Sequence, residues 1–327
     1  MKILIIQNKE ERLNPMLQLN EKHIQQIKEQ FPDSEITVVD DTKEQVDSKI
    51  KDIEIILTSR LHNIDFHQAK SLKWIHVISA GIDRIPDAVL KSNVLITNSS
   101  GVHSIPITEH VFAFMLMFER QIYKTFRIQI EEKKWVRSYK LQNVSELHGK
   151  TIGIIGLGRI GRKIAEIAKA FNIKVLAVVR NPREEKNVDE LYPSDELDKV
   201  LEKSDHVVCC LPLTKETYHL FDYEKFKKMK PSAYFINIGR GKIVNELDLI
   251  RALKESVIAG AGLDVFEEEP LSADSNLWNL ENVIITPHYS GWTPYYMDRV
   301  VDIFCENLRD FIKGKRMPNL IDKDRGY

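Results

Sequence analysis

The stretch Lys150-Thr-Ile-Gly-Ile-Ile-Gly-Leu-Gly-Arg-Ile-Gly-Arg162 joins an apolar run to three closely spaced glycines. The run at 152–155 predicts a buried strand, and the residues after the glycines have the apolar spacing of an amphipathic helix. Strand, G-x-G-x-x-G and helix in this order form a dinucleotide-binding fingerprint. Gly156 suits a tight turn, Gly158 a close approach to a pyrophosphate, and Gly161 close helix packing. The alternative is a glycine turn without a ligand.

The bulk composition indicates a soluble globular chain. Its 327 residues, 43% hydrophobic and 29% charged, are enough for two ordinary domains. A net charge of −1 argues against nucleic acid or an anionic membrane as the main partner. The opening apolar run at 2–6 is too short for a signal peptide or a membrane span. Three cysteines, with Cys209 and Cys210 adjacent, favour a reducing cytoplasm, and no Cys/His cluster has zinc spacing, so no metal is expected.

Strand-like apolar runs alternate with helical stretches on both sides of the glycine loop. The runs lie at 2–6, 35–39, 53–57, 73–78, 94–97, 152–155, 174–179, 205–211, 233–238, 257–263 and 282–286. This alternation predicts an α/β fold with two doubly wound parallel-sheet domains. Because the nucleotide unit lies in mid-chain, we expect a Rossmann domain at 101–293, inserted in a flavodoxin-like substrate domain at 1–100 and 294–327. The amphipathic helix expected at 295–311 would then return to the first domain.

Three further stretches lie outside the strand-like runs. Residues 79–83 follow the fourth run, at the sheet edge where ligands bind, and form either a carboxylate site or an ordinary turn. Eight apolar residues at 111–118 predict a helix buried on most sides. Residues 119–149, which include Trp135 and Tyr139, show no strand pattern. They form either an arm over another subunit or a solvated helix and loop.

Three polar side chains follow predicted strands of the nucleotide domain, where a substrate would meet a cofactor. Arg240 lies between glycines that would let the backbone turn sharply, and its planar fork suits a 2-oxo or 2-hydroxy carboxylate. His288 is suited to exchange a proton near neutral pH. Glu269 lies in an acidic run, and a carboxylate beside the histidine would favour its protonated form. Singly, each residue has an ordinary structural explanation, but together they favour a catalytic set.

The chain resembles the D-isomer-specific 2-hydroxyacid dehydrogenase family nearly end to end. The motifs of this resemblance, in the family's order, are Ser79-Ala-Gly-Ile-Asp83, Gly156-Leu-Gly-Arg-Ile-Gly161, Leu211-Pro-Leu-Thr214 with Thr217, Asn237-Ile-Gly-Arg-Gly241, Gly262-Leu-Asp-Val265 with Glu269-Pro270, and Thr286-Pro-His288. It implies reduction of a short 2-oxo acid, such as glyoxylate, hydroxypyruvate or pyruvate, to the D-2-hydroxy acid by hydride transfer from NAD(P)H. It also implies a homodimer, with the segment near Trp135 at its interface.

The resemblance assigns roles to single residues. Arg240 would bind the substrate carboxylate and keto oxygen, and His288, paired with Glu269, would protonate the carbonyl oxygen. The backbone N–H groups of Ala80 and Gly81 would contact the carboxylate. The implied cofactor-binding positions are Gly156, Gly158, Arg159, Ile160 and Gly161 at the pyrophosphate, Leu211, Pro212 and Thr217 near the adenosine, Ile238, and Asp264 at the nicotinamide carboxamide.

One departure from the family concerns the cofactor. Members that use NAD carry an acidic residue at the end of the second strand of the nucleotide domain, but here that place is Val179. No Asp or Glu occurs between residues 174 and 183. We therefore expect NADP to be preferred over NAD, with Arg180 binding the 2′-phosphate and Arg183 or Asn181 assisting.

Two other functions stay open. The same fold serves transcriptional corepressors, so the chain could be a nucleotide-sensing interaction protein, although an intact set of Arg240, Glu269 and His288 argues against this. A formate-type dehydrogenase also shares the fold, but its chemistry transfers no proton and would not need Glu269. Turnover of glyoxylate separates all three functions.

Overall fold

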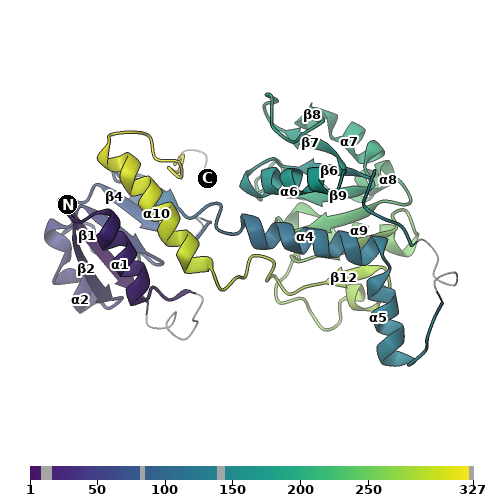
Figure 1. Ribbon diagram of the computed structural model, residues 1–327, viewed down its shortest axis with the longest axis horizontal. Coiled ribbons are helices and arrows are strands. Elements are labelled where there is room, and N and C mark those ends of the chain that lie inside the picture. Colours follow the sequence, from purple (N-terminus) through teal and green to yellow (C-terminus); the bar gives the residue numbers. More distant parts are fainter. Residues whose placement is uncertain (9–16, 82–84, 138–143, 324–327) are drawn as a thin grey trace. The chain divides into compact units, whose positions relative to one another are not determined.

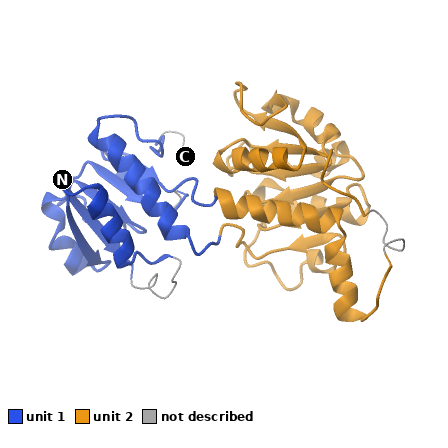
Figure 2. Ribbon diagram, in the orientation of Figure 1, with its two compact units in different colours: residues 1–103, 292–327 blue, residues 104–291 orange. Residues whose placement is uncertain are grey.

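The computed structural model describes residues 1–8, 17–81, 85–137 and 144–323. The chain divides into two compact units, here called unit 1 (1–103 and 292–327) and unit 2 (104–291), shown in blue and orange in Figure 2. The sequence suggested nearby limits, 1–100 with 294–327 and 101–293. That these units behave as separate domains stays a prediction.

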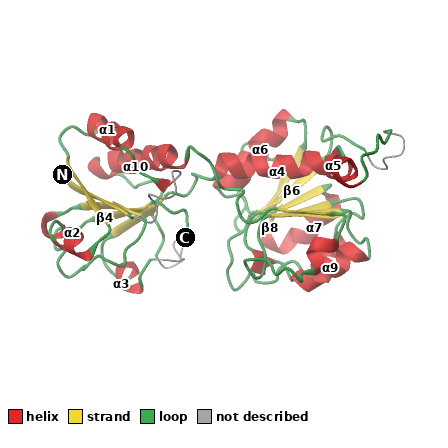
Figure 3. Cartoon of the chain, turned by 90° about the horizontal axis from the view of Figure 1, so that it is seen from below, coloured by secondary structure: helices red, strands yellow, loops and turns green. Residues whose placement is uncertain are grey.

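Unit 1 is built on a parallel sheet with the strand order β2-β1-β3-β4-β5. Its elements are β1 (Lys2–Gln7), α1 (Glu21–Gln30), β2 (Glu35–Asp40), α2 (Lys43–Asp47), η3 (Ile50–Asp52), β3 (Ile55–Thr58), β4 (Trp74–Val77), α3 (Asp87–Leu90), β5 (Leu95–Asn98) and α10 (Tyr296–Ile312). Helices α1 and α10 cover one face of the sheet, and α2 and α3 cover the other (Figure 3). This strand order is that of flavodoxin-like folds, which confirms the prediction for this part of the chain.

The last helix returns to unit 1, as the sequence predicted. The ring of Phe304 on α10 stacks on Trp74 of β4, with 5.2 Å between centroids. The Tyr296 hydroxyl donates to the carbonyl oxygen of Ile78 at 2.7 Å. Helix α10 therefore closes the hydrophobic core over a sheet made by the first segment of the chain.

Unit 2 is a larger parallel sheet with the order β12-β11-β10-β9-β6-β7-β8. Its strands are β6 (Thr151–Ile155), β7 (Lys174–Val179), β8 (Glu190–Pro193), β9 (His206–Cys209), β10 (Tyr234–Asn237), β11 (Gly260–Leu263) and β12 (Val283–Ile285). Its helices are α4 (Ser104–Glu119), α5 (Ile122–Glu131), α6 (Arg159–Ala170), α7 (Leu197–Lys203), α8 (Tyr223–Lys228) and α9 (Glu246–Lys254), with single 3-10 turns η5 (Ser194–Glu196), η6 (Gly241–Ile243) and η7 (Asn276–Asn279). The order reverses between β6 and β9, which is the Rossmann arrangement, so the predicted fold class is confirmed (Figure 1).

Strand β8 was not predicted from the sequence. It pairs in parallel with β7 at the edge of the sheet, Leu176 opposite Glu190 and Val179 opposite Pro193. All of its residues are half-buried. An edge strand with one partner tolerates a proline and charged residues, so it lacks the continuous apolar run that identified the inner strands.

Helix α4 is largely buried, as its apolar run predicted. It packs closely on the sheet because β11 has a glycine where the helix approaches. A Cβ atom at Gly262 would lie 2.8 Å from the ring of Phe114. Among the residues that the structure describes, no helix is long and apolar enough to cross a membrane.

Helix α5 follows α4 and forms part of the stretch at 119–149, for which the sequence left two alternatives. Tyr123 is buried, whereas Ile122, Phe126 and Ile130 are exposed. Tyr139 lies outside the described residues. The stretch therefore contains a helix whose apolar stripe is not covered by the described part of the chain.

Candidate active site

The glycine loop after β6 has the geometry that its sequence predicted. Gly156 has a φ of 101°, in the region that favours glycine. A Cβ atom at Gly161 would lie 2.4 Å from the carbonyl oxygen of Gly156, so only glycine allows α6 this close. Gly158 is the N-cap of α6, and a Cβ atom there would meet nothing within 4 Å. No described side chain caps this end of the 12-residue helix, so its first N–H groups suit an anionic ligand.

Arg240, Glu269 and His288 follow three neighbouring strands. These are β10, β11 and β12, which are hydrogen-bonded in parallel in that order. Carboxyl ends of parallel strands share one edge of the sheet, and all three side chains are exposed there. The fold therefore brings these predicted site residues to the same edge, where open α/β sheets bind their ligands.

His288 and Glu269 form a short hydrogen bond. The imidazole Nδ1 lies 2.6 Å from Oε2 of Glu269. The other carboxylate oxygen, Oε1, accepts from the backbone N–H of Phe266 at 3.0 Å, which fixes the carboxylate. Because a carboxylate accepts, Nδ1–H donates, and Nε2 is the nitrogen left for proton exchange. The exposed fraction of the histidine side chain is 51%.

A buried carboxylate holds the turn that carries His288. The side chain of Asp264 is 1% exposed, and it accepts from the backbone N–H of Tyr289 at 3.1 Å and of Ser290 at 3.1 Å. Its backbone carbonyl accepts from the N–H of His288 at 2.9 Å. These bonds stabilise a left-handed φ of 51° at His288, which is uncommon for a residue other than glycine. The nicotinamide contact expected for Asp264 stays a prediction.

His110 of α4 belongs to the same network but was missed in the sequence. The Thr286 hydroxyl donates to Asp264 Oδ1 at 2.7 Å, so it accepts from Nε2 of His110 at 2.9 Å. Burial lowers the pKa of His110, against the opposing effect of the Asp264 charge, so the ring is neutral near pH 7. The only sequence signal was a lone histidine in an apolar helix pattern, which ordinarily indicates a core residue.

The glycines beside Arg240 serve close packing rather than a sharp turn. A Cβ atom at Gly239 would lie 2.7 Å from the carbonyl oxygen of Leu211, and one at Gly241 would lie 1.8 Å from backbone atoms of Phe266. Neither glycine needs a positive φ. The arginine loop is therefore wedged between the loops after β9 and β11. One Arg240 guanidinium nitrogen donates to the carbonyl oxygen of Gly239 at 2.8 Å.

The other predicted site residues lie in both units. Arg159 and Ile160 begin α6, Leu211 and Pro212 follow β9, and Ile238 is a buried residue following β10. The Thr217 hydroxyl donates to the carbonyl oxygen of Pro212 at 2.8 Å, which shapes that loop.

In unit 1, Ala80 and Gly81 follow β4. The carbonyl oxygen of Ala80 accepts from Asn98 at 2.7 Å, and that of Gly81 accepts from the Ser79 hydroxyl at 2.8 Å. Ile82 and Asp83 of the same motif lie outside the described residues.

Arg183, after β7, and Arg162, on α6, share an acidic neighbour that was not predicted from the sequence. Glu185 accepts from Nε and a terminal nitrogen of Arg162, at 3.0 and 2.7 Å. It also accepts from Nε of Arg183 at 3.2 Å. The bond with Arg162 is the main cause that lowers the pKa of Glu185 to about 2. Arg180 itself is exposed directly after β7.

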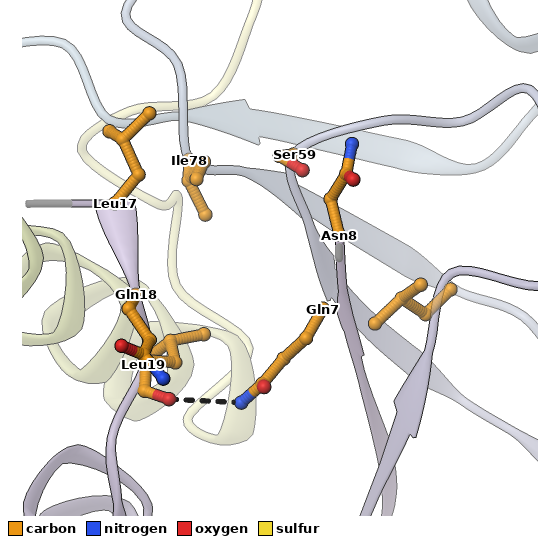
Figure 4. A pocket seen from close by; sticks show the side chains of 8 residues that line it. Gln7, Asn8, Leu17, Gln18, Leu19, Ser59 and Ile78 are labelled. Atoms are coloured by element: carbon orange, nitrogen blue, oxygen red, sulfur yellow. Dashed lines mark hydrogen bonds between the residues drawn. The ribbon is translucent and has the colours of Figure 1, made fainter. Parts of the chain in front are cut away.

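A small pocket lies at the carboxyl edge of the unit 1 sheet (Figure 4). Its lining includes Asn8 after β1, Ser59 after β3 and Ile78 after β4, and Gln7 donates to the carbonyl oxygen of Leu19 at 3.0 Å. Its cavity volume of about 20 Å³ is enough for one water molecule. It is too small to hold an organic acid.

Known proteins resemble the chain in sequence and in fold. Residues 112–290 match the family model described as D-isomer specific 2-hydroxyacid dehydrogenase, NAD binding domain. A glyoxylate reductase from Pyrococcus furiosus is 36% identical over 299 residues, 86% of each chain. A D-isomer specific 2-hydroxyacid dehydrogenase family protein from Aeromonas salmonicida is 33% identical, with a TM-score of 0.78 over 99% of each chain.

A further solved structure contains a cofactor. It is a D-isomer specific 2-hydroxyacid dehydrogenase from Xanthobacter autotrophicus in complex with NADPH and MES, 26% identical, with a TM-score of 0.80 over 99% of each chain. The family model spans more than half of this chain, and the archaeal relative aligns with most of it. The chain therefore belongs to the D-isomer specific 2-hydroxyacid dehydrogenase family.

Proposed function

We propose that the protein is an NAD(P)H-dependent reductase that converts a short 2-oxo acid into the D-2-hydroxy acid. The observation that carries this proposal is the His288–Glu269 pair, 2.6 Å between Nδ1 and Oε2, at the same sheet edge as Arg240. An acid, its carboxylate partner and an anion-binding fork are the groups that carbonyl reduction of an oxo acid requires. Glyoxylate, hydroxypyruvate and pyruvate are the substrates that we would test first, because a relative is a glyoxylate reductase.

The residues of unit 2 fit a dinucleotide. Gly156 and Gly161 allow the tight loop, Gly158 leaves space at the helix end, and the N–H groups of Arg159 and Ile160 begin the helix. We assign the pyrophosphate to this helix end, which favours anions through its dipole. When bound, the reduced nicotinamide supplies the hydride.

His288 provides the proton for the carbonyl oxygen. Its Nδ1–H is held by Glu269, which stabilises the positive ring and leaves Nε2 to donate to the substrate. After reduction the ring is neutral and takes up a proton from water. In the reverse direction, Nε2 accepts the hydroxyl proton of the D-2-hydroxy acid.

Arg240 binds the substrate anion. Its guanidinium fork suits the carboxylate and keto oxygen bidentately, and the loop under it is held by contacts of Gly239 and Gly241 with neighbouring loops. Binding both oxygens orients the carbonyl and stabilises negative charge that develops on its oxygen. We expect this orientation to contribute to kcat as well as to KM.

NADPH is the proposed preferred cofactor, through Arg180. Val179 ends β7 without the carboxylate that would bind a ribose diol and repel a 2′-phosphate. A charge-assisted bond from Arg180 is worth about 1.5–3 kcal/mol, roughly 10- to 150-fold in affinity. Arg180→Ala should therefore lower kcat/KM for NADPH and leave that for NADH almost unchanged. Equal use of both cofactors by the wild type would contradict this preference.

The test of the function is turnover. Purified protein is assayed with glyoxylate, hydroxypyruvate and pyruvate, each with NADPH and with NADH. Formate is assayed with the oxidised cofactors NADP⁺ and NAD⁺. We expect reduction of at least one oxo acid, and a loss of at least about 100-fold in His288→Ala, because general acids contribute that much. Binding of NADPH by this variant, followed by fluorescence, should be unchanged. Turnover of formate alone, or NADPH binding without any turnover, would exclude the proposal.

We also propose that the protein is a homodimer that uses α5. The exposed fractions of Ile122, Phe126 and Ile130, one helical turn apart, are 47, 59 and 60%, and Trp135 beyond the helix is 94% exposed. Apolar side chains grouped in this way on a helix favour burial against another surface. A second copy is the partner that the family resemblance implies.

A further inference from the structure

We propose that Glu185 is a specificity-determining residue for the cofactor. Its carboxylate offsets one of the two positive charges of Arg162 and Arg183, and so it weakens the binding of a 2′-phosphate and limits the preference for NADPH. This inference rests on the proposed nicotinamide function, and it adds an opposing charge to the preference assigned to Arg180.

The carboxylate of Glu185 is fully engaged by the two guanidinium groups. Oε2 accepts from Nε of Arg162, while Oε1 accepts both from a terminal nitrogen of Arg162 and from Nε of Arg183. Arg162 thus makes a bidentate contact, the geometry that holds arginine most firmly. The Glu185 side chain is only 13% exposed, whereas Arg162 and Arg183 are 43% and 76% exposed. The acid is therefore covered by its partners, and the partners face solvent.

The cluster lies where a Rossmann fold recognises the ribose. Arg162 belongs to the first turn of α6, next to the glycine loop, and residues 183–185 belong to the loop after β7. In this fold the end of the second strand and the nearby loop distinguish a 2′-hydroxyl from a 2′-phosphate. The hydrogen bonds of Glu185 tie these two elements together at that point.

The charges of the cluster explain the direction of the effect. Two guanidinium groups and one carboxylate have a net charge of +1, and the side chains share three hydrogen bonds. A 2′-phosphate close to this loop would be attracted by the arginines and repelled by Glu185. It would also compete with Glu185 for the same N–H groups. A 2′-hydroxyl, which is neutral, would experience neither effect.

The test measures binding of small fragments, so it does not depend on turnover. Adenosine 2′,5′-bisphosphate and AMP are titrated calorimetrically into the wild type, Glu185→Gln and Glu184→Gln. Glu184 is the matched control, because it is the exposed neighbour and its substitution removes the same charge. We expect Glu185→Gln to bind the bisphosphate about five- to tenfold more tightly, with AMP binding changed less than about twofold. Glu184→Gln should change both by less than about twofold.

A second set of variants tests whether the arginines transmit the effect. In the Arg162→Ala, Arg183→Ala background, the further change Glu185→Gln should give little gain in bisphosphate affinity. Both guanidinium groups that the Glu185 carboxylate binds are absent from this background, so removing the carboxylate frees neither of them. An undiminished gain in this background would overturn the proposal. So would equal weakening of bisphosphate and AMP in Glu185→Gln, because Glu185 would then only fasten the loop. If no oxo acid is reduced, the proposed function fails, but these binding results still stand.

Discussion

Among single residues, Arg240 gives the sharpest test of how the substrate is held. Arg240→Lys keeps the positive charge but loses the planar fork, so one of two contacts to the oxo acid is lost. We expect KM to rise and kcat to fall, each by about tenfold, which is the effect of roughly 1.4 kcal/mol. Steady-state kinetics with the best oxo acid measures both constants. Values within twofold of the wild type would exclude bidentate binding.

Glu269 should orient His288 for proton transfer. Its Oε2 accepts from Nδ1 of His288 at 2.6 Å, which leaves Nε2 as the nitrogen that faces a substrate. Glu269→Gln keeps the size of the side chain but removes the charge that holds the ring, so kcat for reduction should fall by at least about tenfold while KM changes little. Steady-state kinetics with the best oxo acid measures both constants. An unchanged kcat would show that the two groups do not interact in the working enzyme.

The residues at the candidate site differ in how far the sequence predicted them. Arg240, Glu269 and His288 stand just after predicted strands, so topology alone placed them at one sheet edge. His110 could not be found in this way, because it lies 176 residues from Thr286 in the chain and only the packing of α4 brings the two together. Glu185 was not predicted, because it lies two residues beyond 174–183, the stretch in which an acid that binds the ribose was expected. Contacts between distant segments have no local pattern.

Among the elements, β4 contains a histidine that should make stability depend on pH. His76 is fully buried between the hydroxyls of Thr97, at 2.6 Å, and Ser99, at 3.0 Å, and burial lowers its pKa to about 3. An unfolded chain binds this proton below about pH 6.5, whereas the folded chain does not until about pH 3. The contribution of neutral His76 to the free energy of unfolding is therefore complete above pH 6.5, and it is lost as the pH falls toward 3.

This dependence can be measured as a slope. From this residue alone, the free energy of unfolding should fall by about 1.4 kcal/mol per pH unit between pH 6 and 4. Urea titrations of the wild type and His76→Gln over this range provide the comparison, since all other groups titrate in both proteins. The variant should be less stable at pH 7 but should have the flatter slope. Parallel slopes would mean that His76 is protonated in the folded protein.

The pattern of elements could largely be predicted, because buried parallel strands are continuous apolar runs. The first and last residues of the helices were harder to predict, because they depend on single side chains. Helix α1 begins at Glu21, because Asn20 accepts from the N–H of His23 and donates its own N–H to the ring. This capping box uses a histidine in place of the usual Glu or Gln, so its sequence signal was weak.

At the scale of the whole molecule, the exposed apolar side chains of α5 should decide whether two chains associate. Phe126→Glu places a charge in the middle of the apolar stripe and should convert a dimer into a monomer, as measured by sedimentation equilibrium. Leu247→Glu is the matched control, because this leucine of α9 is 78% exposed and lies on another element. The control should sediment like the wild type. Dimers of unchanged strength in Phe126→Glu would place the interface elsewhere.

The division of unit 1 into two chain segments has a consequence for synthesis on the ribosome. Unit 2 is continuous and can fold as soon as it emerges, but the sheet of unit 1 waits for α10. At about 5–20 residues per second, the interval between residues 103 and 312 is roughly 10 to 40 s. Throughout that time the side of Trp74 that Phe304 later covers has no native partner. The segment of unit 1 that is translated before unit 2 is thus completed after it, and its need for chaperone protection should end only when α10 leaves the ribosome.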